Sequence, residues 1–504
     1  MDFFSSVLHG FAVAFEWQNL VFCFFGVLVG TLIGVLPGLG PVGTMSILLP
    51  ITYGISPVTA IIMLAGIYYG AQYGGSTTSI LVGVPGEASS VVTALDGHQM
   101  ALKGRPGPAL GIAAFGSFIA GTLAIVGLMA LAPPLASVAL RFGPPEYFAL
   151  MILGLVILTY LAQRSLGKAL LMAAVGVVLG TVGLDNMTGM PRFTFGRSEL
   201  LDGIDIAPLA MGLFGVSEIL LNVERTIKKG VIIDKVKNLL PTRKDWVQAF
   251  FPIMRGSLSG FFLGILPGGG ATLSTFVSYS VEKRISKKPE EFGHGAIAGV
   301  AAPESANNAA AQSSFIPLLT LGVPGNSVMA ILLGALMIHG ISPGPLMIQQ
   351  HPDLFWGVVS SMYVGNVMLL LLNLPMIGIW IRLLRVPYGI LFPLILFVAL
   401  TGAYVINGNE MDLYLMLGFG VFGYLMRKFD YEPAPLILAF VLSPMLENAM
   451  RQSLVLSSGS LGIFVSSYIS IGFLTMAALL LISSAMPALK KKRETFAATA
   501  EEEA

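Results

Sequence analysis

Long runs of apolar residues are the feature of this sequence that most limits how it can fold. Runs at 147–161, 166–184, 386–406 and 460–486 approach or exceed the about 20 residues that a helix needs to cross a bilayer. They lack the alternation of apolar and polar residues that is typical of outer-membrane barrels. Only 11% of the 504 residues are charged, against about 25% in a soluble domain. We therefore expect an all-α polytopic membrane protein with about ten to twelve spans.

Basic residues are concentrated in a few of the segments between the apolar runs. These segments contain Arg164 and Lys168, residues 225–244, residues 283–288, Arg382 and Arg385, Arg427 and Lys428, and residues 490–493. The positive-inside rule predicts that they are cytoplasmic. Segments 49–57, 338–345, 407–412 and 457–460 have no basic excess, and 185–205 is more acidic than basic. We expect these segments outside, which predicts an outer N-terminus and a cytoplasmic C-terminus.

The same pattern divides the chain into five predicted parts. They are an N-terminal interfacial helix (1–18), a first half (19–224), a basic cytoplasmic linker (225–245), a second half (246–487) and a cytoplasmic tail (488–504). The first 19 residues have no Lys or Arg and no small-residue cleavage site, so we expect them to remain in the mature chain. Cys23 is the only cysteine, which excludes an intrachain disulfide.

Three motifs occur twice, in the same order. Residues 34–40 (GVLPGLG) recur as 264–270 (GILPGGG), 83–86 (GVPG) recur as 322–325, and 106–108 (PGP) recur as 343–345, at offsets of 230, 239 and 237. The core motifs of the two halves therefore cover residues 34–108 and 264–345. One such match is weak, but three in register indicate an internal repeat.

The two copies differ in the charge of equivalent loops. Residues 51–54 carry no basic residue, whereas the second copy has Lys283, Arg284, Lys287 and Lys288 at this point; near the PGP motifs, Lys103 and Arg105 have no counterpart in 338–346. The copies should therefore cross the membrane in opposite directions. Inverted-topology repeats with Gly/Pro-broken helices and re-entrant hairpins point to a transport site at the midplane.

Proline and glycine inside the apolar runs should break the helices. Such a break survives in a bilayer only inside protein or beside a wet cavity, and the helix that begins after it can hold an anion at its N-terminus. We therefore predict substrate-binding residues at and after the breaks. They are Pro37, Gly38, Gly40, Thr44, Gly74, Gly75, Ser76, Thr77, Thr78, Pro85, Gly86, Pro267, Gly268, Gly270, Thr272, Pro324, Gly325 and Asn326. The alternatives are kinks for close helix packing and hydroxyls bonded to their own helix.

A second polar group stands in the segment 302–308, which we expect to be the spatial counterpart of 73–79. Glu304, Ser305, Asn307 and Asn308 offer the oxygen ligands that suit Na⁺, or a proton site on Glu304. We predict a coupling-ion site there. The alternatives are a paired Glu304 at an interface and asparagines that join helices.

Other chemistries find no support in the sequence. Residues 38–43 (GLGPVG) match a dinucleotide fingerprint, but no strand precedes them and no acid follows about 20 residues later. No phosphate-binding loop, HExxH motif or cysteine pair is present. We expect no enzyme activity and no cofactor other than the coupling Na⁺ or H⁺. The candidate blocks also contain no Lys or Arg, so amide dipoles, hydroxyls and co-bound cations would neutralise an anion.

The blocks 34–41, 69–86, 264–270, 303–308 and 322–325 resemble the large membrane subunit of the tripartite tricarboxylate transporters, and the likeness runs from about 19 to 487. This resemblance implies a bacterial inner-membrane permease that works with a small membrane subunit and a periplasmic solute-binding protein. Together they would import citrate or related carboxylates with an ion gradient, and residues 76–79 and 304–308 would lie near the substrate. The alternatives are a stand-alone cation-coupled carboxylate symporter, a channel or scaffold, and an intramembrane enzyme.

Overall fold

The chain is described by a computed structural model that covers residues 3–36, 40–160, 165–185, 187–224, 236, 238–266, 268, 270–384 and 388–485. Pro37, Gly38 and Pro267, most of the predicted linker and the predicted tail lie outside the described residues. The covered part is helical apart from β1 (Gly183–Leu184) and β2 (Pro191–Arg192), which pair antiparallel. The prediction of a helical membrane protein is confirmed at this level.

Residues 3–224 contain α1 (Phe3–Ala14), α2 (Trp17–Val35), α3 (Gly40–Leu48), η1 (Leu49–Gly54), α4 (Pro57–Val82), η2 (Ala88–Ser90), α5 (Val91–Leu102), α6 (Pro106–Ala139), α7 (Pro144–Tyr160), α8 (Leu166–Leu179), η3 (Ser198–Leu200), α9 (Ile206–Ala210), η4 (Met211–Val216) and α10 (Ser217–Glu224).

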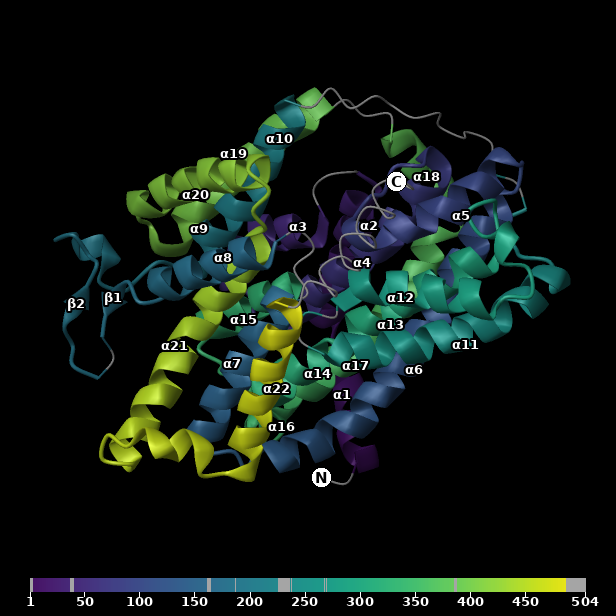
Figure 1. Cartoon of the computed structure of the whole chain (residues 1–504). Helices are drawn as coiled ribbons and strands as arrows, with labels where there is room; N and C mark the ends of the chain where they lie inside the picture. Colours follow the sequence, from purple (N-terminus) through teal and green to yellow (C-terminus); the bar gives the residue numbers. More distant parts are fainter. Residues whose placement is uncertain are drawn as a thin grey trace.

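Residues 243–485 contain α11 (Arg243–Ile265), which begins within the predicted linker, α12 (Gly270–Ile285), η5 (Pro289–Glu291), α13 (Ala298–Ser313), α14 (Phe315–Leu321), α15 (Ser327–Ile338), α16 (Met347–Gln350), α17 (Pro352–Asn373), α18 (Ile377–Leu383), α19 (Tyr388–Asn407), α20 (Glu410–Lys428), α21 (Pro433–Leu456), η6 (Leu461–Val465) and α22 (Tyr468–Ala485). Figure 1 places α8, α9, α20 and α21 on the left and α5, α11 and α12 on the right.

Within the described residues, five helical segments are long and apolar enough to cross a membrane: 17–35, 106–139, 206–224, 352–373 and 433–456. Two further long helices, α4 and α11, do not reach that apolarity. Helix α4 carries the Ser/Thr run, although nearly all of its residues are buried. A buried polar helix of this kind is enclosed by other helices, away from the lipid.

Glycines bring α2 against α4 and α11 against α13 in the same way. A Cβ at Gly30 would lie 2.4 Å from the backbone oxygen of Ile67, and one at Gly260 would lie 2.3 Å from that of Ala306. The neighbouring turns repeat this contact through Gly26 and Gly34 in α2 and through Gly256 and Gly264 in α11. The equivalent glycines are 230 residues apart and their partners 239, as in the sequence motifs. Small residues allow helix backbones to approach this closely.

The starts of these two helix pairs lie in different surroundings. At the start of α2, Asn19 accepts a hydrogen bond of 2.6 Å from Thr59 at the start of α4. At the start of α11, Asp245 pairs with Arg105 at 2.5 Å. Lys103, in the same junction of α5 and α6 as Arg105, donates to the backbone oxygen of His294, between η5 and α13, at 2.6 Å. Equivalent helix starts therefore have different neighbours: α11 begins beside the junction of α5 and α6.

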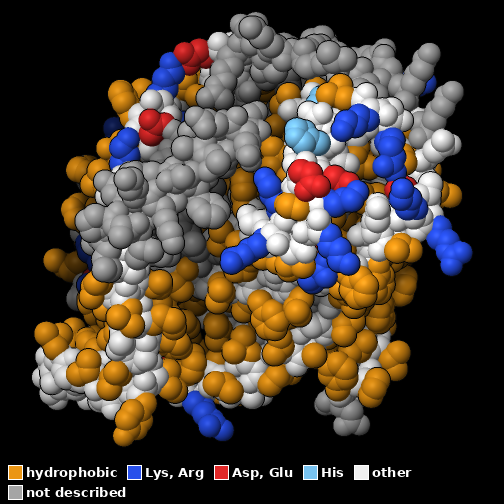
Figure 2. Space-filling model, turned by 45° about the vertical axis from the view of Figure 1, so that its right-hand side comes forward, with side chains coloured by type: hydrophobic (Ala, Val, Ile, Leu, Met, Phe, Trp, Pro, Cys, Tyr) orange, Lys and Arg blue, Asp and Glu red, His pale blue; other side chains and the backbone are white. Residues whose placement is uncertain are grey.

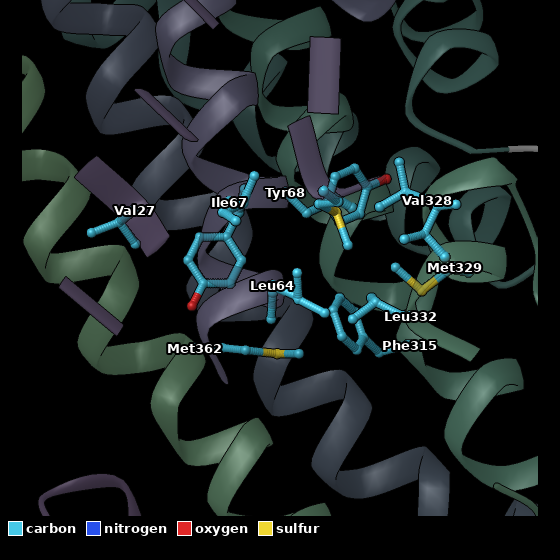
Figure 3. Close-up of a cluster of buried hydrophobic side chains, with 14 of the residues drawn as sticks. Val27, Leu64, Ile67, Tyr68, Phe315, Val328, Met329, Leu332 and Met362 are labelled. Atoms are coloured by element: carbon cyan, nitrogen blue, oxygen red, sulfur yellow. The ribbon is translucent and has the colours of Figure 1, made fainter. Parts of the chain in front are cut away.

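Apolar side chains from both parts of the chain form a shared core. Figure 3 shows Val27 of α2, Leu64 of α4, Phe315 of α14, Leu332 of α15 and Met362 of α17 in one buried cluster. These five helices come from both halves of the chain, so the core joins the copies. This packing positions the polar residues that lie beside it.

The outer surface is largely apolar. Phe250, Phe251, Leu258 and Phe262 of α11 are more than half exposed, as expected for side chains that face lipid. Figure 2 shows a broad hydrophobic surface, with most of the visible Lys and Arg side chains gathered on one part of this face. A surface of this kind does not suit water on all sides.

Candidate functional site

Helix breaks occur at equivalent points of the two copies. Helix α4 ends at Gly83 (φ 74°, ψ 14°) and α14 ends at Gly322 (φ 73°, ψ 14°), both in the left-handed region. Glycine adopts this conformation without the steric cost that a side chain brings. Each GVPG motif therefore stops one helix before the next one begins.

The breaks within each copy also lie against one another. In the first copy, a Cβ at Gly86 would lie 2.1 Å from the backbone oxygen of Gly34 and 2.6 Å from the Cα of Gly75. In the second copy, the Gly268 N–H donates to the backbone oxygen of Gly325 at 2.6 Å. The approach at Gly86 leaves no room for a Cβ. The predicted glycines of different motifs are thus brought together.

The helix starts that follow the breaks are close to each other in the second copy. Gly270 begins α12 with φ +51°, and a Cβ there would lie 3.8 Å from Cβ of Asn326. Asn326 caps α15, because its Oδ1 accepts the N–H of Met329 at 3.0 Å. Pro324 and Gly325 directly precede this cap. Two helix N-termini, which carry partial positive charge, therefore adjoin.

The predicted hydroxyls fall into two groups. Thr44 donates to the backbone oxygen of Gly40 at 2.7 Å and Thr77 to that of Tyr73 at 3.4 Å, so the alternative of bonding within the helix applies to both. Thr78 instead donates to the backbone oxygen of Val35 at 2.7 Å and so provides a hydrogen-bond donor for a carbonyl group in the last turn of α2. Thr272 is half-buried in α12.

Glu304 is the centre of a buried cluster of hydroxyls. It is 1% exposed. Its carboxylate accepts hydrogen bonds from Ser76 at 2.7 Å, from Thr93, and from Ser117 at 3.4 Å. Asn308 donates to Ser117 Oγ at 2.7 Å and extends the cluster. These donors come from α4, α5 and α6, so the cluster joins one acid of the second copy to three helices of the first.

The other predicted coupling-ion residues are placed differently. Ser305 donates to the backbone oxygen of Ala301 at 2.8 Å, within its own helix. Asn307 is fully buried, and its Oδ1 accepts from Ser89 at 2.8 Å. Segments 73–79 and 302–308 thus face each other across the copies. The repeat offset of 239 makes 312–318 the equivalent of 73–79, so 302–308 is its contact partner and not its repeat counterpart.

Five residues of the site were not among the predicted ones: Gln72, Glu87, Ser89, Thr93 and Ser117. Glu87 could have been found from the repeat, because it follows the first GVPG motif as Asn326 follows the second. Gln72, Thr93 and Ser117 sit on different helices and give no local signal. Among the described residues, no Lys or Arg donates to Glu304 or Glu87.

A cavity of about 510 Å³ lies away from this cluster, between the β1–β2 loop (residues 183–203), α15 and α21. Its charged wall is a ring of ion pairs: Arg192 to Glu447 at 2.7 Å, Arg451 to Asp185 at 2.9 Å and Arg451 to Glu447 at 2.6 Å. None of its lining residues is a predicted site residue. Its acids outnumber its arginines, so it does not favour an anion.

Comparisons with known proteins agree with the resemblance seen in the motifs. The family model described as "Tripartite tricarboxylate transporter TctA family" matches residues 20–438. An Agrobacterium vitis protein named "Uncharacterized 52.8 kDa protein in TAR-I ttuC' 3'region" is 52% identical over 494 residues, 98% of each chain. A second, "Uncharacterized protein in TAR-II ttuC' 3'region" from Agrobacterium vitis, is 50% identical over 235 residues, 47% of this chain and 97% of that protein. No solved structure matches the chain.

Proposed function

Because this chain belongs to the TctA family, the membrane component of tripartite tricarboxylate transport, we propose that it is the subunit that carries the substrate across the membrane. The substrate is a tricarboxylate or a related small carboxylate. A small membrane subunit and a periplasmic binding protein complete the importer, and an ion gradient drives it.

One observation carries this proposal: a buried polar cluster lies where the interrupted helices of the two copies meet. Glu304 and Asn308 of α13 bond to hydroxyls of α4, α5 and α6. Polar groups buried inside a membrane protein are costly and are characteristic of transport pathways. A merely structural interface would not require helix breaks beside the cluster.

The contacts at the helix starts support opposite orientations of the copies. The start of α11 pairs with the junction of α5 and α6, where Arg105 meets Asp245. The start of α2 lies with Thr59 at the other end of that copy. If the repeats are inverted, the breaks meet at the midplane, as in other transporters of this architecture.

The charge balance supports coupling to a cation. The described partners of the cluster are hydroxyls and amides, so an entering carboxylate would meet no Lys or Arg there. The N-termini of α12 and α15 offer partial positive charge only. Co-bound Na⁺ or H⁺ supplies the remaining charge, and its gradient then drives import.

Uptake of labelled citrate into proteoliposomes tests this function. The purified chain, the small subunit and the binding protein are combined, and a Na⁺ or a proton gradient is imposed. We expect uptake above the gradient-free level with one of the two gradients and with all three components. Equal uptake without either gradient would overturn the coupling, and full uptake by this chain alone would indicate a stand-alone symporter.

Glu304→Gln separates two roles of the acid in the same assay. Loss of the response to a proton gradient, with substrate binding retained, supports a proton site at Glu304. Unchanged coupled uptake would make Glu304 a structural residue.

A further inference from the structure

Ser89 lies at the centre of an oxygen-rich group, which we call the Ser89 cluster (Gln72, Glu87, Ser89 and Asn307). Its hydroxyl is 2.7 Å from Oε1 of Gln72 and 2.8 Å from Oδ1 of Asn307. It also contacts Oε1 of Glu87. Gln72, Ser89 and Asn307 are at most 2% exposed, so bulk water is not available to complete their hydrogen bonds.

This arrangement has too few protons. A serine hydroxyl has one hydrogen and can donate to one acceptor, yet three acceptor oxygens surround it. Nδ2 of Asn307 is buried and has no hydrogen-bond partner, so it donates to none of these oxygens. Buried polar groups are nearly always paired, so oxygens that share too few donors call for a specific cause. A bound cation removes the deficit, because it attracts all of these oxygens at once.

Glu304 provides the contrast within the same region. Its carboxylate already accepts from three hydroxyls, those of Ser76, Thr93 and Ser117. Each of its two carboxylate oxygens therefore has a hydroxyl within hydrogen-bond distance, although the Ser76 hydroxyl is also 2.9 Å from the backbone oxygen of Gln72. In the Ser89 cluster, Oε1 of Glu87 and two amide oxygens share a single hydroxyl proton.

The repeat adds an independent reason to single out Glu87. Glu87 and Asn326 are 239 residues apart and follow the two GVPG motifs. Both cap the helical turn that begins there: Glu87 accepts from the Ser89 N–H at 2.9 Å, and Asn326 accepts from the Met329 N–H at 3.0 Å. An amide suffices as the cap, so the charge of Glu87 has a purpose beyond capping.

We propose that the Ser89 cluster binds Na⁺ between Glu87 of the first copy and Asn307 of the second. Hard cations take oxygen ligands such as carboxylates, amide carbonyls and hydroxyls. A single carboxylate balances one positive charge, which favours a monovalent ion at a buried site. Because the ligands come from both copies, the ion holds α4 and the start of α5 against α13. Its use as the coupling ion rests on the proposed transport function, but its binding does not.

Thermal unfolding of the purified chain in detergent tests the site without transport. The midpoint is measured as Na⁺ replaces choline at constant ionic strength, and again with K⁺. We expect the wild-type midpoint to rise with Na⁺, because a ligand that binds the folded state stabilises it. Glu87→Gln should raise the half-saturating Na⁺ concentration at least tenfold, since even residues that only support metal ligands change affinity by about 10- to 100-fold.

Matched variants keep the test decisive. Glu410→Gln makes the same chemical change at the exposed start of α20 and should respond to Na⁺ like the wild type. Glu87→Asp retains the charge and should keep part of the Na⁺ response. Ser89→Ala removes one ligand and should weaken the Na⁺ response. This variant replaces Glu87→Gln in the test if Glu87→Gln does not fold.

Two results would overturn the site. If the wild-type midpoint were the same in Na⁺, K⁺ and choline, with and without citrate, the Asn307 amide would instead donate to Ser89 and the cluster would be structural. If folded Glu87→Gln kept the full Na⁺ response, the ion would bind elsewhere. If Glu87→Gln does not fold, a full Na⁺ response of Ser89→Ala would lead to the same conclusion. If the protein showed gradient-coupled uptake but the variants kept the wild-type Na⁺ response, the proposed Na⁺ site would be wrong and the proposed transport function would stand. If Na⁺ bound at Glu87 but no citrate were taken up, the Na⁺ site would stand and the proposed transport function would be wrong.

Discussion

At the scale of single residues, the role of each acid follows from its neighbours. Glu304 is surrounded by hydroxyls from three helices, while Glu87 shares one hydroxyl with two amide oxygens. The first arrangement is complete as it stands and the second is not. Glu304 therefore has its hydrogen-bond donors within the protein, whereas the proposed Na⁺ would complete the surroundings of Glu87.

Glu304→Ala should destabilise the fold more than Glu304→Gln. The alanine variant leaves the buried hydroxyl of Thr93 without its acceptor, at about 1–3 kcal/mol for a buried group that loses its partner. Glutamine keeps one acceptor oxygen. Thermal unfolding of both variants in detergent checks the order. Equal midpoints for the two variants would contradict the role of the carboxylate as a common acceptor.

The sequence predicted only part of this chemistry. Glu304, Ser76, Asn307 and Asn308 stood out because polar residues are rare in so apolar a chain, and they do meet at the site. Thr93 and Ser117 could not be found, because their role arises from contacts with a helix about 190 to 210 residues further along. Thr44 and Thr77 were predicted as substrate-binding residues, and their hydroxyls bond to their own helices, which was the alternative to that prediction.

At the scale of helices, close backbone packing defines each copy. The glycines of α2 lie against α4 and those of α11 against α13, with the same four-residue spacing. The broken helices begin directly after these pairs. The pairs are therefore the rigid part on which the breaks are held.

Gly30→Ala and Gly260→Ala should lower stability by similar amounts. Each added Cβ would lie within 2.4 Å of a backbone oxygen, which must move, and overpacking of this kind costs about 1–3 kcal/mol. Gly418→Ala on α20 is the matched control, because open space surrounds Gly418. Unfolding midpoints of the three variants give the comparison. A control variant as unstable as the other two would argue against the packing account.

The β1–β2 loop should loosen in acid. The N–H of Met187, the N–H of Thr188 and the guanidinium of Arg451 lower the pKa of Asp185 to about 2 from an ordinary value of 3.8. Because the folded pKa is depressed, this stabilisation is complete above the ordinary pKa and is lost as the pH falls toward about 2.

Pepsin cleavage near Phe195, which is 86% exposed, measures this loosening. The wild-type rate should rise as the pH falls from about 4 to about 2, beyond the change in pepsin activity on an unfolded substrate. Asp185→Asn should be cleaved readily across this range, whereas Asp202→Asn in the same loop should behave like the wild type. A rate for Asp185→Asn equal to the wild type would contradict the role of this carboxylate.

At the scale of the whole molecule, sequence reasoning reached the membrane class and the family, and both are confirmed. It reached them because apolar runs and duplicated Gly/Pro motifs are local signals. The number of spans, the division into halves and the inverted orientation stay predictions, since they depend on where the lipid lies. The ring of ion pairs around Asp185 was missed for a related reason: Arg192 and Arg451 are far apart in the chain and meet only in the fold.

Opposite orientation of the copies is the central claim, and cysteine labelling tests it most directly. Gly54 and Arg284 are 230 residues apart at equivalent, exposed positions, and the native Cys23 is only 1% exposed. Gly54→Cys and Arg284→Cys are each treated in intact cells with a maleimide that does not cross the inner membrane. We predict that Gly54→Cys reacts from outside and that Arg284→Cys reacts only after the membrane is opened. Reaction of both cysteines from the same side would contradict the inverted repeat and the shared site that depends on it.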